Sequence, residues 1–435
     1  MGSLIVSLTS VLGPSARVVS WAKTLTKFVS VQVAVQVMTV AGGLLLVRVL
    51  SQTEYAYFTI ANSMQATMNI LADSGIGIGL SSIGGRVWQS PFRFGQLINT
   101  AMRLRRYLAA VAIAVVTPVL VWMLVANGAT YLYAGAVTAA VLLGLNYQLL
   151  TSVLMVVPRL HSQISRVQKL DFLAAASRLA LLVAAYSVFV NAAVGVSATV
   201  AGLVTQYYFL RRWVAGSIDV KAPASEEDRK TILGIVKSQS PNAVFYCMQG
   251  QLSVWLISIL GSTENIAEIG ALGRLGIMFS IIGAVMTSIV LPSFARCRRQ
   301  DQLRGRYFQI VGAFCSFGLG LIAFAGLFPD RLLWVLGGKY GHLRGELFLM
   351  MVMTAFNSVV AAMWSLNSSR AWIKWSWLNI PGVILTQIFL PLFLNISTLS
   401  GVLWFGIFSL VPTFLLNCML TFRGLLAEGR PHACD

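Results

Sequence analysis

Acidic residues are scarce in this sequence, and so are charged residues of any kind. Asp, Glu, Lys and Arg together make up 11% of the 435 residues, whereas a soluble globular domain carries about 25%. Hydrophobic residues make up 57%, and the mean hydropathy is +0.77. Because long apolar runs recur along the whole chain, this composition excludes an ordinary soluble domain and predicts a membrane protein.

Cysteine and histidine are also few, and their positions exclude the usual uses of both residues. The five cysteines show no paired spacing, which excludes a disulfide scaffold and a zinc site. The three histidines are far apart and have no ligand-like neighbours. We therefore expect no catalytic residues, no metal site and no cofactor. These residues are Cys247, Cys297, Cys315, Cys418 and Cys434, and His161, His342 and His432.

Basic residues far outnumber acidic ones and give a net charge of +18. A soluble protein with this excess would be a candidate for nucleic-acid binding, but no basic tract interleaved with aromatic residues occurs, so we expect no nucleic-acid partner. In a polytopic membrane protein, the excess indicates cytoplasmic loops that face anionic lipids. No basic region precedes the first apolar residues, which favours an interfacial segment at 1–27 over a cleaved signal peptide.

Apolar runs of about 20 residues, the length that crosses a bilayer, predict an all-α protein with twelve transmembrane spans in two six-helix lobes. The predicted spans are approximately 28–50, 56–84, 107–126, 131–157, 172–190, 193–210, 239–260, 266–293, 308–328, 346–367, 377–394 and 399–421. The predicted domains are an N-terminal interfacial segment (1–27), an N-terminal lobe (28–212), a cytoplasmic linker (213–237), a C-terminal lobe (238–422) and a cytoplasmic tail (423–435).

The distribution of Lys and Arg gives an independent test of this count. When loops are assigned to alternate sides of a twelve-span arrangement, and Arg274, early in the eighth span, is counted with the loop before it, 26 of the 32 Lys and Arg fall on one side and four on the other. The remaining two, Arg48 and Arg178, lie inside spans. This asymmetry is what the positive-inside rule predicts, and it places both termini in the cytoplasm.

The two halves of the sequence resemble each other at an offset of 210 residues. Since each half has an even number of spans, both enter the membrane from the same side, which predicts parallel repeats about an axis normal to the membrane. Such repeats place a substrate cavity between the halves, near the middle of the membrane. The matching pairs are Leu50–Glu54 with Leu260–Glu264, Arg86 with Arg296, and Asn127-Gly128 with Gly337-Gly338.

A polar stripe runs along the second predicted span. Its members, Asn62, Gln65, Asn69 and Asp73, are spaced three, four and four residues apart and therefore share one helical face. A carboxylate inside an apolar helix is costly unless it faces a partner or a water-filled cavity. The stripe therefore indicates a wet interior, although such groups also join neighbouring helices.

The first and seventh spans carry similar polar faces. These faces hold Gln32, Gln36 and Thr39 in the first span, and Asn242, Tyr246, Gln249 and Ser253 in the seventh. We predict that Asn62, Gln65, Asn69, Asn242 and Gln249 bind substrate in the cavity.

The sequence VRVLSQTEYAYF, followed later by LADSGIG, resembles the O-antigen and exopolysaccharide flippases of the multidrug/oligosaccharidyl-lipid/polysaccharide exporter superfamily. The likeness covers essentially the whole chain in length, span count and basic central linker. The chain departs from the family at Ser51 and Ala56, where glycines are usual. The matching residues are Arg48, the Leu-small-x-x-x-Tyr link of Leu50, Ser51 and Tyr55, in which Ser51 matches only as a small residue, and Asp73, Gly75 and Arg86.

This resemblance implies a MATE-like fold and a flippase of the bacterial inner membrane. Such a protein moves undecaprenyl-pyrophosphate-linked oligosaccharide from the cytoplasmic to the periplasmic leaflet during O-antigen, lipopolysaccharide or exopolysaccharide synthesis. The implied partners are the lipid-linked oligosaccharide, membrane lipids and, as candidates, the polysaccharide polymerase and chain-length machinery. We expect alternating access, with residues 28–212 rocking against 238–422.

Three arginines are candidates to bind the pyrophosphate through charge-assisted hydrogen bonds: Arg48, Arg178 and Arg274. Each has another interpretation, because Arg48 can snorkel to the interface, Arg178 can pair with Asp171 or Asp73, and Arg274 can pair with Glu264 or Glu268. Asp73 is either a structural partner of Arg48 or a carrier of the coupling proton. The clustered loop arginines are expected to set the topology, and recruitment of the anionic lipid headgroup is the alternative; they are Arg103, Arg105, Arg106, Arg296, Arg298 and Arg299.

Two other functions compete with the flippase. A cation-coupled multidrug exporter of the same superfamily would need acidic residues inside the membrane, but the first and seventh spans have no Asp or Glu. A membrane glycan polymerase or ligase would need a large extracytoplasmic loop with catalytic groups, and the longest such loop here is roughly 329–345. We therefore predict a transporter rather than an enzyme.

Overall fold

The computed structural model of the protein is helical throughout most of the part that it describes, and no strand occurs in that part. The all-α prediction is therefore confirmed for these residues. The described residues are 14–161, 163–186, 191–276, 283, 286, 290, 291, 294, 300–370, 372 and 375–428. The chain divides into two units, Met1–Gln251 (unit 1) and Leu252–Asp435 (unit 2), which are described separately.

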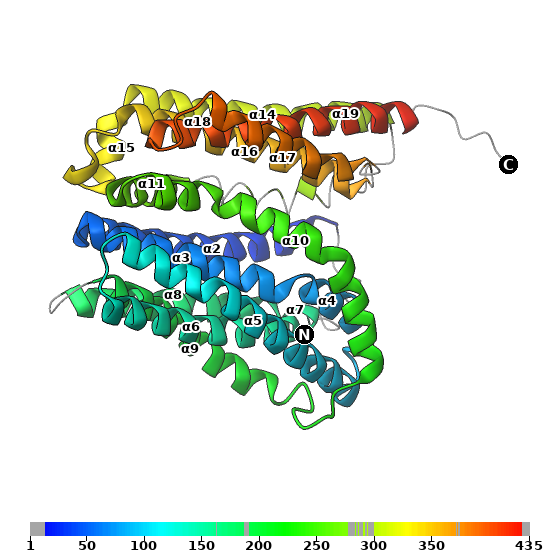
Figure 1. Ribbon diagram of the computed structural model, residues 1–435. Helices are drawn as coiled ribbons and strands as arrows, with labels where there is room; N and C mark the ends of the chain where they lie inside the picture. Colours follow the sequence, from blue (N-terminus) through cyan, green and yellow to red (C-terminus); the bar gives the residue numbers. More distant parts are fainter. Residues whose placement is uncertain are drawn as a thin grey trace. The chain divides into compact units, whose positions relative to one another are not determined.

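Unit 1 contains the helices that correspond to the six predicted spans of the N-terminal lobe (Figure 1). In it α3 packs against α5, α6 and α9, while α8 packs against α2 and α9. The helices are α2 (Pro14–Val49), α3 (Gln52–Asp73), α4 (Ile76–Val87), α5 (Pro91–Ala126), α6 (Tyr131–Leu154), α7 (Val156–Leu160), α8 (Ile164–Tyr186), α9 (Ala192–Val214) and most of α10 (Glu226–Leu260).

Unit 2 begins near the end of α10 and repeats much of this packing. In it α16 packs against α11, α14, α18 and α19, while α17 packs against α18 and α19. The elements are α11 (Thr263–Leu275), α14 (Gln300–Leu327), α15 (Pro329–Leu336), η2 (Gly338–Tyr340), α16 (Arg344–Ser369), η3 (Ser376–Leu378), α17 (Asn379–Phe389), η4 (Leu390–Leu392), α18 (Leu399–Ser409) and α19 (Val411–Glu428).

Six of the helices begin directly after a residue whose side chain caps the helix. Ser51, Ser90, Thr130 and Asn191 each accept a hydrogen bond from the backbone three residues later, at the starts of α3, α5, α6 and α9. In unit 2, Ser262 and Thr398 do the same for α11 and α18. Such caps satisfy amides that have no partner within the helix and fix where each helix starts.

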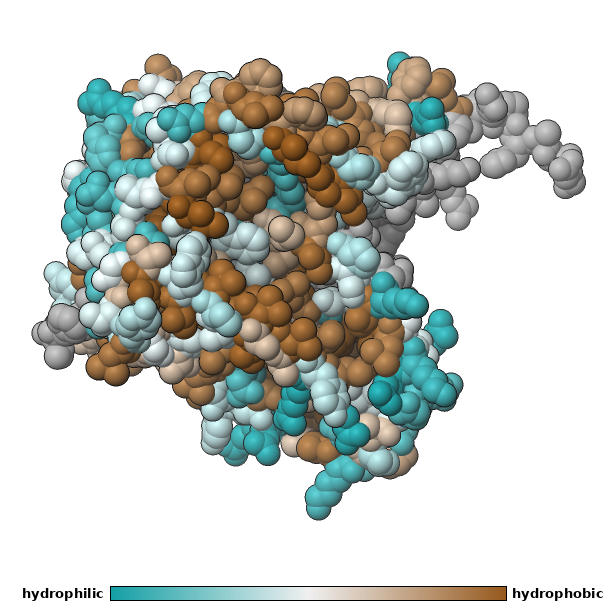
Figure 2. All heavy atoms as spheres, viewed as in Figure 1, coloured by the Kyte–Doolittle hydropathy of each residue, from teal (hydrophilic) through white to brown (hydrophobic). Residues whose placement is uncertain are grey.

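The membrane-spanning character of the helices is evident from their length and their surfaces. Within the described residues, seven helices are long and apolar enough to cross a membrane, and Val244–Leu260 and Ser376–Leu392 are shorter apolar stretches. Large apolar side chains are exposed along α5 and α14, as an acyl-chain environment requires; Val111 is 63% exposed and Leu319 65%. Figure 2 shows apolar side chains over much of this face and hydrophilic ones at its left edge and lower right.

Most of the described residues in every predicted span are helical, but several spans contain breaks. The second span is interrupted at Ser74 and Gly75, the fourth at Met155 and the twelfth at Leu410, and α11 ends at Leu275 within the eighth. The eleventh span consists of α17 between the short 3-10 helices η3 and η4. The third span is longer than predicted, because α5 already begins at Pro91. Residues 187–190 of the fifth span and most of 277–293 in the eighth lie outside the described residues.

The predicted linker, 213–237, is folded against unit 1 rather than free of it. Asp219 N donates to Pro91 O (3.0 Å), and the side chain of Asn99 donates to Ala222 O (2.7 Å). Gly95 lies directly beneath this segment, and a Cβ there would come within 2.2 Å of Asp219 O. Glycine is therefore required at this position, because the linker backbone approaches α5 too closely for any side chain.

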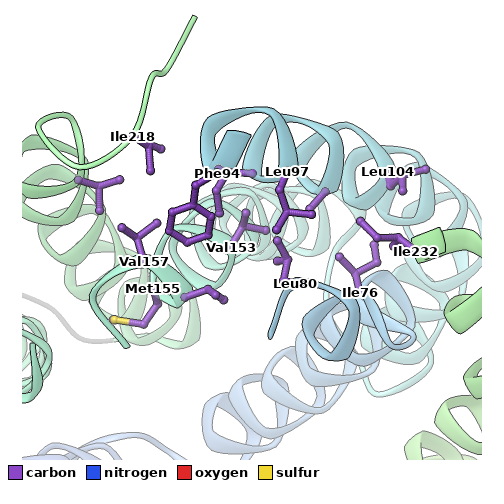
Figure 3. Close-up of a cluster of buried hydrophobic side chains, with 14 of the residues drawn as sticks. Ile76, Leu80, Phe94, Leu97, Leu104, Val153, Met155, Val157, Ile218 and Ile232 are labelled. Carbon is purple, nitrogen blue, oxygen red and sulfur yellow. The ribbon is translucent and has the colours of Figure 1, made fainter. Parts of the chain in front are cut away.

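A hydrophobic core fixes the linker, the start of α10, and α4, α5 and α7 together (Figure 3). Phe94 of α5 is fully buried at its centre, beside Val157 of α7. Ile218 from the linker and Ile232 from α10 are buried in the same cluster. The division between the units consequently falls inside α10, at Gln251 and Leu252, and not in the linker. The functional lobe boundaries remain a prediction.

Unit 2 has its own smaller core and a buried polar network. Phe294, Tyr307 and Leu366 belong to the core. Next to it the Tyr307 and Thr421 hydroxyls lie 2.6 Å apart, and Thr421 donates to Asn367 Oδ1 (3.0 Å). The Asn367 amide donates to Asn417 Oδ1 (3.1 Å). These polar groups form hydrogen bonds with one another. They therefore join α14, α16 and α19 without placing an unpaired polar atom in an apolar environment.

Candidate functional site

A break in the second span organises the polar residues of unit 1. Ser74 (φ 35°) and Gly75 (φ 99°) adopt left-handed backbone conformations, which end α3 and allow α4 to start in a new direction. The Asp73 carboxylate accepts a hydrogen bond from Gly77 N (3.3 Å) in the first turn of α4. The Asp-x-Gly motif therefore forms a discontinuous helix whose new N-terminus is next to a carboxylate, a favourable arrangement for the helix dipole.

Arg105 is the partner of Asp73. Its Nη2 atom lies 3.2 Å from Asp73 Oδ1, and the Arg105 residue is only 4% exposed. Asp73 therefore takes part in an ion pair, but the predicted partners, Arg48 and Arg178, are not the ones that the structure gives it. Arg105 is also not a loop residue, because α5 extends beyond it to Pro91. The pairing with Asp73 was not predicted, and the expectation that Arg105 helps to set the topology stays a prediction.

The other members of the stripe have separate environments. Gln65 is buried, and its Nε2 donates to Gln148 Oε1 of α6 (3.2 Å). Asn62 is half-buried and donates to Phe58 O within its own helix (3.0 Å). The Oδ1 atom of Asn69 is buried and accepts no hydrogen bond within the described residues. Part of the stripe thus joins α3 to α5 and α6, as the structural interpretation expects.

A second polar edge of α3 faces α10. The Ser63 hydroxyl donates to Gln251 Oε1 (2.7 Å), and the Cys247 thiol lies 3.7 Å from Thr67 O. Neither Ser63 nor Gln251 was singled out from the sequence, although both lie beside predicted stripe residues. Gln249 is half-buried in α10. The side chain of Asn242 lies outside the described residues.

The three candidate arginines occupy three different helices. Arg48 is exposed in the last turn of α2, Arg178 is half-buried in α8, and Arg274 is half-buried in the last turn of α11. Arg48 and Arg178 belong to unit 1, whereas Arg274 belongs to unit 2. Their assembly around one substrate therefore stays a prediction.

Acidic side chains withdrawn from solvent share one property. Six of those in the described residues are buried or half-buried, and each has a polar partner. They are Glu54 with Tyr133 and the backbone of Ala192, Asp73 with Arg105, Asp171 with Gln206, Asp228 with Arg93, Glu268 with His342, and Glu346 with Ser400. Only Asp73 and Asp228 are paired with an arginine. The other four accept hydrogen bonds from hydroxyl, amide, backbone or imidazole groups, which leave further acceptor capacity on each carboxylate.

Unit 2 contains a cavity of its own, of about 350 Å³. Polar and small residues of α16 form one wall, and larger apolar residues form another. None of the described residues that line it has an ionisable side chain. This cavity was not predicted from the sequence, which gave only a cavity between the halves. The lining residues are Gly276, Gly283, Met286, Phe314, Thr354, Asn357, Ser358, Ala361, Ala362 and Ser365.

These features define an all-α membrane protein with interrupted spans, polar faces within its bundles and a repeated helix packing. Its fold is that of the MATE transporters. An inward-facing multidrug resistance MATE family transporter of the MOP superfamily has a TM-score of 0.68 at 16% identity, and the match covers 93% of this chain and 100% of that one. At this identity the similarity establishes the fold alone.

Two further solved structures have the same fold. The MATE multidrug transporter DinF-BH, solved with a bound ligand, has a TM-score of 0.64 at 17% identity, over 92% of this chain and 94% of its own. A MOP superfamily transporter from Pyrococcus furiosus, whose reverse polarity of the binding pocket suggests a different function, has a TM-score of 0.57 at 15% identity, over 94% and 96%. No protein-family model and no curated protein matches the chain.

Proposed function

We propose that the protein is a membrane transporter that moves lipid-linked oligosaccharides, carried on undecaprenyl pyrophosphate, between the leaflets of the bacterial inner membrane. The MATE fold supports transport, because its solved members are transporters. The sequence resemblance to polysaccharide-export flippases supports the substrate class. The O-antigen or exopolysaccharide pathway, the cytoplasmic termini and the polymerase and chain-length partners belong to the same proposal.

One observation carries the choice of an anionic substrate. The carboxylate of the polar stripe, Asp73, is paired with buried Arg105, and the first and seventh predicted spans contain no Asp or Glu. A transporter for cations needs a carboxylate that can accept the cation inside the membrane. Half-buried Arg178 and Arg274, together with Arg48, are instead suited to a pyrophosphate, because guanidinium groups form charge-assisted, bidentate hydrogen bonds with phosphate oxygens.

A transport assay with the full chain tests this proposal. The purified protein is reconstituted in liposomes with a fluorescent undecaprenyl-pyrophosphate-linked oligosaccharide, and translocation is measured as protection from an impermeant glycosidase. We expect faster translocation than in protein-free liposomes. Arg48→Glu, Arg178→Glu and Arg274→Glu should each reduce the rate, whereas Arg331→Glu, at an exposed site near the start of α15, should not. If all three reversals translocate as fast as the parent, the arginines do not bind the pyrophosphate.

A cation-coupled multidrug exporter is the second candidate function. The specific observation in its favour is that two of the solved structures described above are multidrug transporters. The same liposomes distinguish the two functions, since an exporter of this class would move a lipophilic cation such as ethidium. Ethidium transport without glycan translocation would replace the first proposal by the second.

A further inference from the structure

The two units place different side chains at corresponding positions of their repeated helices. α3 corresponds to α11 and α6 to α16, because both pairs occupy the same place in the packing of their units. Gln65 in α3 and Gly276 at the end of α11 lie the same number of residues from the first residue of their helices. By the same count from the helix starts, Gln148 in α6 corresponds to Ala361 in α16.

In unit 1 the side chains of Gln65 and Gln148 fill the space between α3 and α6. Gln65 Nε2 lies 3.2 Å from Gln148 Oε1. A Cβ added to Gly144 would come within 3.0 Å of Gln65 Nε2, so the neighbouring glycine gives the amide its room. In unit 2 the corresponding residues have almost no side chain, and the cavity of about 350 Å³ lies beside them, lined by both Gly276 and Ala361.

The polar wall of this cavity can accept and donate hydrogen bonds. Thr354 Oγ1 donates to Met350 O and Ser365 Oγ to Ala361 O, both at 2.8 Å, so each hydroxyl oxygen retains its capacity as an acceptor. Asn357, which corresponds to Gly144 of unit 1, is exposed on the cavity wall and offers an amide donor and an acceptor. Ser358 adds a further hydroxyl.

Apolar side chains also line the cavity, and its described lining residues carry no charge. Phe314 and Met286 supply an aromatic and a thioether surface. Since these described residues include no Asp or Glu, the lining disfavours a cation, and since they include no Lys or Arg, it disfavours a phosphate. The volume is far larger than the roughly 30 Å³ occupied by one water molecule, and it lies within the range of about 300–1,000 Å³ that is typical of small-molecule sites.

We infer that this cavity of unit 2 binds an uncharged sugar ring of the lipid-linked oligosaccharide. A sugar ring has hydroxyl groups at its edge, which match Asn357, Thr354 and Ser365, and an apolar C–H face, which matches Phe314. The inference depends on the proposed function and deepens it, since it gives unit 2 the recognition of the glycan and leaves the pyrophosphate to arginines elsewhere.

The test compares two probes that differ only in the sugar. Binding of undecaprenyl pyrophosphate and of undecaprenyl-pyrophosphoryl N-acetylglucosamine to the full chain in detergent is measured by native mass spectrometry. We expect the parent to prefer the sugar-bearing lipid about tenfold, as one or two net hydrogen bonds would provide. The double variant Gly276→Gln/Ala361→Gln, which installs the glutamine pair of unit 1, should lose this preference but still bind the sugar-free lipid.

Two more variants make the result decisive. Asn357→Leu keeps a side chain of similar size, removes the amide and should reduce the preference several-fold without filling the cavity. Gly345→Gln is the matched control, because this exposed glycine at the start of α16 has nothing near its Cβ position and should keep the full preference.

The outcomes separate the two proposals. A parent that prefers the sugar-bearing lipid, with double and Asn357→Leu variants that prefer it equally, overturns the sugar site and leaves the flippase proposal standing. A parent that binds neither lipid overturns both. Equal binding of the two lipids by the parent overturns the sugar site alone, since it shows recognition of the pyrophosphate without the sugar.

Discussion

Unit 1 and unit 2 use the same helix packing with different side-chain chemistry. The contact of α5 with α6 is repeated by α14 with α16, that of α6 with α9 by α16 with α18, and that of α3 with α6 by α11 with α16. Unit 1 joins its helices through charged side chains such as the pairs of Arg93 with Asp228 and Arg105 with Asp73. In unit 2 the ion pair of Arg344 with Asp330 is exposed and Glu268 pairs with His342, while the buried junction of α16 with α19 is the neutral Asn367–Asn417 network.

This difference suggests how the work is divided between the repeats. Removing one partner of a buried ion pair strongly destabilises the fold. A unit that contains such pairs therefore keeps its helices in the one arrangement that holds the partners together. Neutral hydroxyl and amide groups tolerate rearrangement better and are suited to an uncharged ligand. We therefore interpret unit 1 as the more rigid repeat and unit 2 as the repeat adapted to the glycan. The following predictions test the two halves of this comparison.

The largest effect is expected at the ion pair that joins α5 to the start of α10 within unit 1. Arg93 Nη2 donates to Asp228 Oδ1 (2.8 Å) and Nη1 donates to Oδ2, while the Asp228 side chain is 4% exposed. Arg93→Ala leaves a buried carboxylate without its partner and should lower the free energy of unfolding by about 3 kcal/mol. Denaturant titration of the detergent-solubilised chain measures this change.

A neighbouring surface pair provides the control for Arg93. Arg229 and Glu226 form an ion pair in the first turns of α10, but both side chains are more than half exposed. Arg229→Ala should therefore change the free energy of unfolding by less than about 0.5 kcal/mol. An equal loss in the two variants would mean that burial of Asp228 does not determine the energy of the Arg93 pair.

The next effect is expected at Arg105. Its partner Asp73 has a side chain that is 37% exposed, so water compensates part of the lost interaction. Arg105→Ala should lower the free energy of unfolding by about 2 kcal/mol. The double variant Arg105→Ala/Asp73→Asn should recover part of this loss, because no unpaired carboxylate remains. Lack of any recovery would show that Arg105 acts by packing rather than by charge.

The case of Arg105 shows how far the sequence could predict the structure. Hydropathy starts the third span after this residue, because Arg103, Arg105 and Arg106 interrupt the apolar pattern. The local signal of Ser90 followed by Pro91, a capping residue and a first-turn proline, marks the true helix start. That signal was available, whereas the pairing with Asp73 depends on how α3 and α5 pack and cannot be obtained from spacing within one helix.

The repeat was predicted correctly, but identical residues in the two halves do not give the correct alignment of α3 with α11. LSQTE and LGSTE match at an offset of 210, yet the capping serines Ser51 and Ser262 place α11 one residue further along. Gln65 aligns with Gly276 only when the two helices are aligned on their capping serines, Ser51 and Ser262. The cavity of unit 2 was missed for this reason, since it results from side chains that are absent at positions which become neighbours only after folding.

A smaller effect is expected at the third residue of α3 and of α11. In unit 1 this residue contacts the start of α9, and in unit 2 it contacts the residues just before α18. Glu54 accepts hydrogen bonds from Ala192 N (2.7 Å) and from the Tyr133 hydroxyl. The corresponding Asn265 makes only an exposed contact of 3.4 Å with Ser397 O. Glu54→Ala should lower the free energy of unfolding by about 1.5 kcal/mol, and Asn265→Ala by less than about 0.5 kcal/mol.

The Glu54 and Asn265 variants directly test the asymmetry of the units. Each is a truncation to alanine at the same position after a capping serine. Asn has a lower helix propensity than Glu, so the change to alanine favours the helix by a few tenths of a kcal/mol more at Asn265 than at Glu54. Denaturant titration under the same conditions measures both. Equal losses at Glu54 and Asn265 would contradict the conclusion that unit 1 relies on charged contacts more than unit 2 does.

The smallest effect is expected to be the same in the two units. The hydroxyl of Ser51 accepts from Glu54 N (3.2 Å) and that of Ser262 from Asn265 N (3.3 Å), which gives both repeats the same helix cap. Ser51→Ala and Ser262→Ala should each cost about 1 kcal/mol, measured by the same titration. Ser51→Asp and Ser262→Asp, which restore an acceptor, should recover most of that loss. If alanine lowers the free energy of unfolding at Ser51 but not at Ser262, the two caps are not equivalent. The alignment of Gln65 with Gly276, which depends on these caps, would then be wrong.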